Sequence, residues 1–149
     1  MLADVLNEDL VICDLDASTG EEVIETLVER ICATDDVEDC ARAKADVLAN
    51  EQRSSTGMQH GVAIPHAKTE AVSRLHAAVA VTREPIEFDS LDGQPCRIFV
   101  MTLSPPNQAG PHMRFLAEIG RLLKSKRIRK AILAARTPSE LLRAFGSQS

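Results

Sequence analysis

Two of the four histidines occupy rigid positions at the ends of predicted elements. His66 follows Pro65 directly beyond a short apolar run, where an α/β sheet usually presents its ligand groups. His112 follows Pro111 at the start of a predicted helix, whose free backbone N–H groups favour an anion. Such a pair is suited to a phosphoryl group, with one imidazole as the nucleophile and the other as a hydrogen-bond donor to its oxygens.

The residues alone leave other uses of the histidines open. Sequence spacing does not establish that His66 and His112 meet, and two exposed histidines without a role are the alternative. His60 and His66 lack a third ligand at a recognisable zinc spacing, so we expect no metal site and no cofactor. His76 lies among apolar neighbours in a predicted strand, where a hydrogen-bonded structural histidine is expected.

Predicted helices and strands must hold these histidines in place. Ser18 and Glu21 match the capping box at a helix start, and Asp36 is the expected N-cap of a second helix that ends near Asn50. The Asp-Gly pair within a turn at 91–95 supplies a positive φ. Strands are predicted at 10–13, 62–65, 75–81 and 97–103, and later helices at 111–123, 128–135 and 138–145. This order predicts layered α/β packing in a single domain over residues 1–149.

Composition and charge exclude several classes of protein. Aromatic residues make up 3% of the chain, with no Trp or Tyr, which leaves little material for stacking nucleic-acid bases. The net charge of −5 is uneven: −11 over residues 1–50, −1 over 51–111 and +7 over 112–149. Six basic residues fall between 121 and 130, but apolar residues among them are spaced to face a core. We therefore expect a solvated helical face that contacts either an acidic partner or the acidic residues of segment 1–50, and we expect no nucleic-acid partner.

Cysteines and apolar runs indicate the compartment. The four cysteines contain no C-x-x-C pair, and the chain is too long to need disulfide staples, so we expect reduced thiols that mostly fill the core. The first nine residues are acidic and lack the basic region of a secretory signal, and no apolar run approaches a membrane span. These features predict a cytoplasmic protein without membrane insertion.

The segment from Ser55 to Lys68, STGMQHGVAIPHAK, resembles the active-site segment of the fructose/mannitol-type (type 2) enzyme IIA domains of the bacterial phosphoenolpyruvate-dependent phosphotransferase system. The turn at 91–95 followed by an apolar strand, His112 after a Pro/Asn/Gly loop and the segment 137–142 also fit this family. The resemblance spans about residues 5–145, and Gly-Val-Ala-Ile-Pro-His is its most specific element.

The resemblance implies a mixed sheet flanked by helices on both faces, giving α/β/α layers. It implies that His66 is the phosphorylated nucleophile, His112 the second active-site histidine, and an HPr-like phosphocarrier protein the donor. The family usually places an Arg sixteen residues before the nucleophile, where this chain has Asn50, and Arg53 is the nearby guanidinium that could substitute. The residues expected to bind or support the phosphate are Arg53, Ser55, Thr56 and His60.

Three functions follow from these features. The first is a phosphohistidine carrier that passes its phosphoryl group on or signals by its phosphorylation state, as the free-standing nitrogen-regulatory IIA proteins do. The second is a degenerate binding module that docks on a kinase or transporter without phosphotransfer, motivated by Asn50 and by Gln59 in place of the usual Gly. The third is a sugar-specific IIA subunit with the same chemistry.

Overall fold

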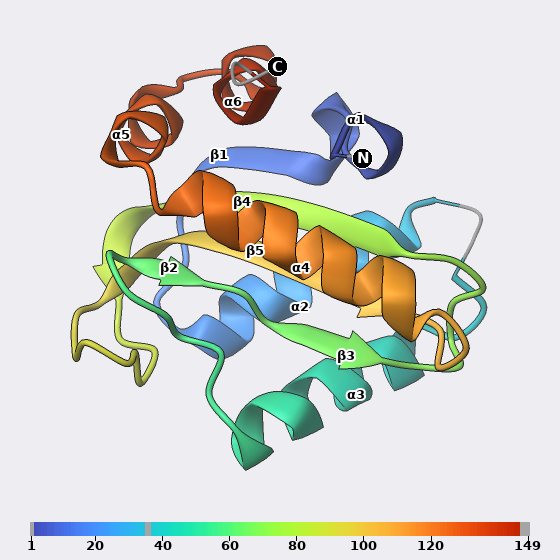
Figure 1. Cartoon of the computed structure of the whole chain (residues 1–149). Helices are drawn as coiled ribbons and strands as arrows, with labels where there is room; N and C mark the ends of the chain where they lie inside the picture. Colours follow the sequence, from blue (N-terminus) through green and yellow to red (C-terminus); the bar gives the residue numbers. More distant parts are fainter. Residues whose placement is uncertain (1, 35–36, 147–149) are drawn as a thin grey trace.

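A mixed sheet of five strands lies between two layers of helices in a computed structural model that describes residues 2–34 and 37–146 (Figure 1). The strands are β1 (Val11–Leu15), β2 (Val62–Ala63), β3 (His66–Lys68), β4 (His76–Ile86) and β5 (Cys96–Ser104). The central strands β4 and β5 are antiparallel, β1 runs parallel to β4, and both β2 and β3 run parallel to β5. The mixed sheet and its helical layers confirm the predicted fold class.

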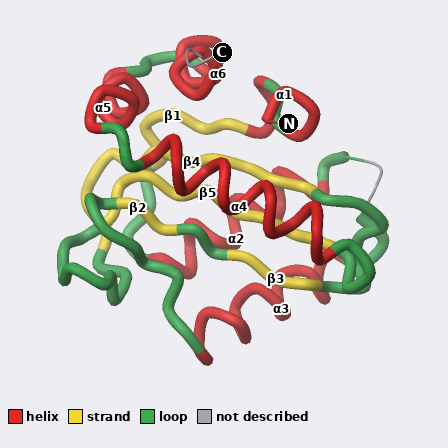
Figure 2. Tube along the Cα trace, viewed as in Figure 1, coloured by secondary structure: helices red, strands yellow, loops and turns green. Residues whose placement is uncertain are grey.

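Helices cover both faces of this sheet (Figure 2). They are α1 (Leu2–Val5), the 3-10 turn η1 (Glu8–Leu10), α2 (Gly20–Cys32), α3 (Cys40–Arg53), α4 (Ala109–Leu123), α5 (Lys126–Ala134) and α6 (Pro138–Gly146). On one side α2 packs on β4 and α3 on β3, while α4 and α5 contact β5 across the opposite face (Figure 1). No helix of the described segments is both long and apolar enough to cross a bilayer.

The first two long helices begin slightly later than predicted. The capping box of α2 joins Thr19 and Glu22, one residue beyond the predicted Ser18 and Glu21. The cap of α3 is Asp39, whose carboxylate accepts from the backbone of Arg42. The expected cap Asp36 lies outside the described residues, and α3 continues to Arg53, past the predicted end near Asn50. Several neighbouring residues at each helix start have side chains that can cap the helix, and the tertiary structure determines which of them does.

The core is aliphatic and forms around the four phenylalanines of the chain. Phe88, Phe99, Phe115 and Phe145 are all buried, and the rings of Phe88 and Phe99 meet edge to face with centroids 5.3 Å apart. Every residue of β4 from 76 to 82 is buried, because helices cover this strand from both sides. The core therefore holds β5, and the short strands β2 and β3 that pair with it, in a fixed register.

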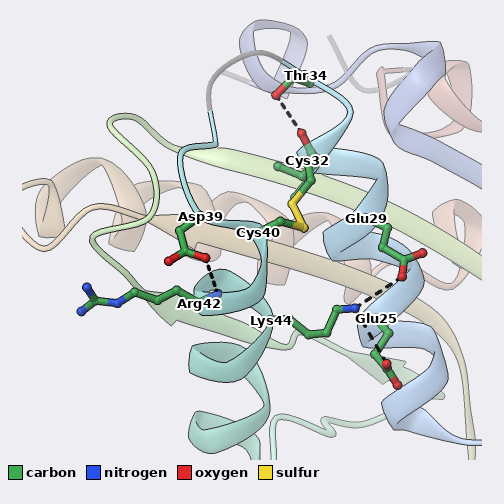
Figure 3. Close-up of a disulfide and its surroundings, with 9 residues drawn as sticks. Glu25, Glu29, Cys32, Thr34, Asp39, Cys40, Arg42 and Lys44 are labelled. Atoms are coloured by element: carbon green, nitrogen blue, oxygen red, sulfur yellow. Dashed lines mark hydrogen bonds and ion pairs between the residues drawn. A yellow bond between two sulfur atoms is a disulfide. The ribbon is translucent and has the colours of Figure 1, made fainter.

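A disulfide between Cys32 and Cys40 corrects the prediction of reduced thiols for these two cysteines (Figure 3). Cys32 ends α2 and Cys40 begins α3, and their Cα atoms lie 5.9 Å apart, a distance that suits a disulfide. The prediction considered only whether a chain of this length needs disulfides for stability. It could not show that the ends of these two helices lie close together. Cys13 and Cys96 are free thiols, as predicted.

Candidate functional site

His66 opens β3 and is oriented by the backbone two residues earlier. Its Nδ1 lies 2.8 Å from the carbonyl oxygen of Ile64. A carbonyl can only accept, so Nδ1 carries the proton and Nε2 carries the free lone pair of the neutral ring. On its strand, His66 pairs in parallel register with Thr102 of β5. The imidazole is thus held at one nitrogen and left nucleophilic at the other.

His112 lies in the first turn of α4 and faces His66. The helix begins at Ala109, so Pro111 is its third residue and not its first as predicted. The two imidazole rings meet edge to face, with centroids 5.6 Å apart and an interplanar angle of 78°. The structure therefore brings together the two histidines that the sequence analysis paired. His112 is only 3% exposed, and its Nε2 has no hydrogen-bond partner within the described residues.

Burial keeps the His112 ring neutral at physiological pH. Desolvation is the main cause, with smaller contributions from the charges of His66 and Lys68, and together they lower the pKa of His112 from 6.5 to about 4. A neutral imidazole has one N–H donor and one acceptor nitrogen. His112 therefore offers a hydrogen bond to an incoming group without adding a permanent charge.

A pocket of about 390 Å³ surrounds the two histidines, and three elements contribute to it. Its lining side chains include Asp46, Asn50 and Arg53 from α3, His66 and Lys68 from β3, and His112, Met113 and Leu116 from α4. Lys68 was not among the predicted site residues. Residues i and i+2 of a strand share a face, so its position two residues after the expected nucleophile is the signal that could have found it. Lys68 and Arg53 give the pocket cationic groups that suit an anionic ligand.

Asn50 and Arg53 connect the end of α3 to the nucleophile. The Nδ2 amide of Asn50 donates to the main-chain carbonyl of His66 at 2.8 Å, and Nη2 of Arg53 donates to Oδ1 of Asn50 at 2.9 Å. The residue at the position of the family's Arg thus holds the backbone of His66. The guanidinium one helical turn later is oriented by the same amide and reaches the same pocket.

Three predicted supporting residues lie outside this pocket. Ser55 donates its hydroxyl to the carbonyl of Phe88 at 3.0 Å, and the buried Thr56 donates its own to Glu51. His60 lies in a tight turn with a φ of +64°, and its backbone N–H donates to Asp92. None of the three lines the pocket of His66 and His112. Their contacts fold the segment that leads to the nucleophile.

Comparison with known proteins finds similar sequences and folds among phosphotransferase components. The chain matches the family model of the phosphoenolpyruvate-dependent sugar phosphotransferase system, EIIA 2, over residues 4–147. It is 34% identical over 118 residues to the fructose-specific EIIA component of Haloferax volcanii, which covers 79% of this chain and 77% of that protein.

A longer relative and a solved structure agree with this match. The chain is 35% identical over 130 residues to the 2-O-alpha-mannosyl-D-glycerate-specific EIIABC component of Escherichia coli, covering 86% of this chain and 20% of that protein. The crystal structure of the nitrogen regulatory protein IIA-Ntr from Neisseria meningitidis superposes with a TM-score of 0.89 at 25% identity, covering 97% and 98% of the two chains. The chain thus spans only about a fifth of the EIIABC relatives that it matches. These matches show that the chain belongs to the EIIA type 2 family of the phosphoenolpyruvate-dependent sugar phosphotransferase system.

Proposed function

We propose that this protein is a phosphocarrier in which Nε2 of His66 accepts a phosphoryl group from an HPr-like protein. The hydrogen bond from Nδ1 of His66 to the carbonyl of Ile64 carries this proposal. It leaves the second ring nitrogen unprotonated in a pocket that also holds His112 and two cationic side chains. Such an arrangement prepares an imidazole for nucleophilic attack on phosphorus.

The transfer needs positioning and charge stabilisation more than proton chemistry. The lone pair on Nε2 of His66 attacks the phosphorus of the donor's phosphohistidine and forms a new N–P bond. The donor's N–P bond breaks, and its electron pair stays on the donor's ring nitrogen. His66 keeps its Nδ1 proton throughout, so the Ile64 carbonyl faces the positive character that the phosphorylated ring acquires. His112, Lys68 and Arg53 are the groups within the pocket that can donate to the phosphoryl oxygens.

The test is phosphorylation with purified components. The protein is incubated with phosphoenolpyruvate, enzyme I and an HPr homologue, and acid-labile phosphate is measured beside a working IIA protein. We expect labelling of the wild type as 3-phosphohistidine, the Nε2 isomer, and none of a His66→Ala variant. An unlabelled wild type in a mixture that labels the control, or a labelled His66→Ala variant, refutes the proposal.

A second candidate, a binding module that docks on a kinase or transporter without phosphotransfer, is favoured by Asn50. One of its two amide N–H donors is used by the His66 carbonyl and its oxygen accepts from Arg53, so Asn50 offers the phosphate at most one uncharged donor in place of a guanidinium. Asn50→Arg, Arg53→Ala and the remote control Arg143→Ala separate the two candidates. If Arg53 serves the phosphate, Arg53→Ala loses labelling by about tenfold or more while the control is unchanged. A large gain in Asn50→Arg over a poorly labelled wild type supports the degenerate module instead.

The phosphorylation state of His66 is the signal through which this protein would act on a regulated kinase or a transporter. This regulatory proposal rests on the likeness to nitrogen regulatory proteins, whereas the sugar-specific relatives support a IIA subunit that passes the group onward. Labelling of a cognate sugar-specific IIB domain by the phosphorylated protein would support the second role. Binding to a kinase or transporter that changes on phosphorylation would support the first.

A further inference from the structure

Glu51 binds the segment that leads into the nucleophile through three hydrogen bonds. The hydroxyl of Thr56 donates to Oε1 of Glu51 at 2.6 Å, and the backbone N–H of Thr56 lies 3.0 Å from Oε2 and 3.3 Å from Oε1. Thr56 is only 6% exposed, so its two donors would be costly to leave without a partner. Hydrogen bonds to a carboxylate are among the stronger ones in proteins. Glu51 therefore anchors Thr56 firmly to α3.

Thr56 in turn holds Ile64 across a small hairpin. The backbone N–H of Ile64 donates to the carbonyl of Thr56 at 3.0 Å, and Met58 donates to the carbonyl of Val62 at 2.8 Å. The turn of this hairpin contains His60, which has a positive φ. Residues 56–58 thus run beside residues 62–64 on the side of β2 that faces away from β5.

Ile64 needs this external support because it sits at an interruption of the sheet. It lies between β2 and β3, and the following Pro65 has no N–H to donate to a neighbouring strand. Its carbonyl is the group that accepts from Nδ1 of His66. Thr56 holds the preceding peptide through the N–H of Ile64, and Thr102 of β5 holds the following peptide through the carbonyl of Pro65, so the peptide that carries the Ile64 carbonyl is fixed from both ends.

We propose that Glu51 is a positioning residue that sets the tautomer of His66, acting through Thr56 and the Ile64 carbonyl. A neutral imidazole can carry its proton on either nitrogen, and only the Nδ1–H form leaves Nε2 nucleophilic. Without Glu51 the hairpin loses its anchor on α3, the Ile64 carbonyl moves, and the ring samples both forms. This inference deepens the phosphocarrier proposal and rests on it for the kinetic consequence, although the tautomer itself can be measured without any phosphate donor.

The first experiment reads the ring directly. Nitrogen-15 spectra of the imidazoles are recorded for the wild type and for Glu51→Ala, Glu51→Gln and Thr56→Val. The neighbouring exposed residue supplies the control Gln52→Ala, which leaves the chain of hydrogen bonds intact. We expect a single Nδ1–H form of His66 in the wild type and control, a mixture in Glu51→Ala and Thr56→Val, and recovery in Glu51→Gln, whose amide oxygen still accepts. Circular dichroism identifies any variant that is unfolded, and if Glu51→Ala is unfolded, the more conservative Thr56→Val variant carries the comparison with the wild type. An unchanged tautomer in a folded Glu51→Ala or Thr56→Val variant overturns the inference.

The second experiment follows phosphate acceptance from the HPr homologue. We expect Glu51→Ala to lower kcat by about tenfold while KM for the donor changes little, because the lost interaction orients the nucleophile and does not bind the donor. Glu51→Gln should restore most of the rate. A mixed tautomer with an unchanged rate, or an equal loss in Gln52→Ala, overturns the inference. A wild type that accepts no phosphate but shows the tautomer shift in Glu51→Ala refutes the phosphocarrier proposal while supporting the role of Glu51.

Discussion

Acidification should destabilise this protein through His112, and the size of the effect follows from its burial. In the folded state the pKa of His112 is about 4, whereas the unperturbed value is 6.5. As the pH falls below 6.5, the unfolded chain binds a proton at this residue and the folded protein does not. The free energy of unfolding therefore falls with decreasing pH until the folded protein is also protonated, near pH 4.

The magnitude is set by the interval between the two pKa values. An interval of about 2.5 units, from 6.5 to 4, at about 1.4 kcal/mol per unit corresponds to about 3.5 kcal/mol in full, of which about 3 kcal/mol is lost by pH 4, where the folded protein is half protonated. This is a large share of the total stability of a domain of this size, which is about 5 to 15 kcal/mol. The group is almost fully buried, so solvent does little to reduce the effect.

Urea unfolding of the wild type and of His112→Gln measures this effect. The experiment covers a range from about pH 8 to about pH 4, which spans the interval between the two pKa values. Glutamine keeps a polar side chain at the site but does not titrate. All other titrating groups are common to the two proteins, so the difference between their free energies of unfolding isolates His112. We expect this difference to shift against the wild type by about 3 kcal/mol across the range. Parallel curves for the two proteins would refute a buried, neutral His112.

Phosphorylation of His66 should reverse the electrostatics of the same residue. In the unmodified protein the charge of His66 contributes to the lowered pKa of His112, because two positive groups would face each other. A phosphoryl group adds negative charge beside the ring and favours its protonated form. NMR titration should therefore give a higher pKa for His112 in the phosphorylated protein. An unchanged value would mean that the phosphoryl group does not reach His112.

The disulfide, a closely packed glycine and the basic C-terminal segment, residues 112–149, give three further predictions. Replacing Cys32 and Cys40 by Ser should lower the free energy of unfolding by about 2 to 3 kcal/mol, measured in urea and matched by the wild type under reducing conditions. Gly20→Ala places a methyl group against the buried ring of Phe88 and should lower the free energy of unfolding by about 1 to 3 kcal/mol. Gly120→Ala has open space for its methyl group and should raise the free energy of unfolding by up to about 1 kcal/mol. Equal changes in melting temperature for the two variants would contradict this prediction. Lys124→Glu should weaken salt-dependent binding of the HPr homologue more than it changes stability, and a variant that unfolds but binds normally when folded would show that the charge serves packing.

Local rules were sufficient for much of the fold and for the two central residues of the site. Alternating apolar runs, proline positions and a capping box depend on neighbours within a few residues, so β5 and the helix that contains Pro111 could be predicted to within two positions, whereas β4 continues to Ile86, past its predicted end at 81. His66 and His112 were recognisable because each follows a proline at the boundary of an element. The family resemblance then supplied the mixed sheet with helices on both faces, which residue patterns alone do not determine, whereas the strand order and register came from the structure.

The other features of the site depend on contacts between residues far apart in the chain, so only the tertiary structure determines them. The burial that keeps His112 neutral and its meeting with His66 need α4 packed across the sheet. The bond from Asn50 to the His66 carbonyl needs α3 beside β3, and the link between Cys32 and Cys40 needs two helix ends in one place. The sequence by itself thus determined which side chains could do the chemistry and which segments form helices and strands. Only the folded chain determined how one imidazole is oriented and the other desolvated, because hydrogen-bond geometry and burial arise from packing between separate elements.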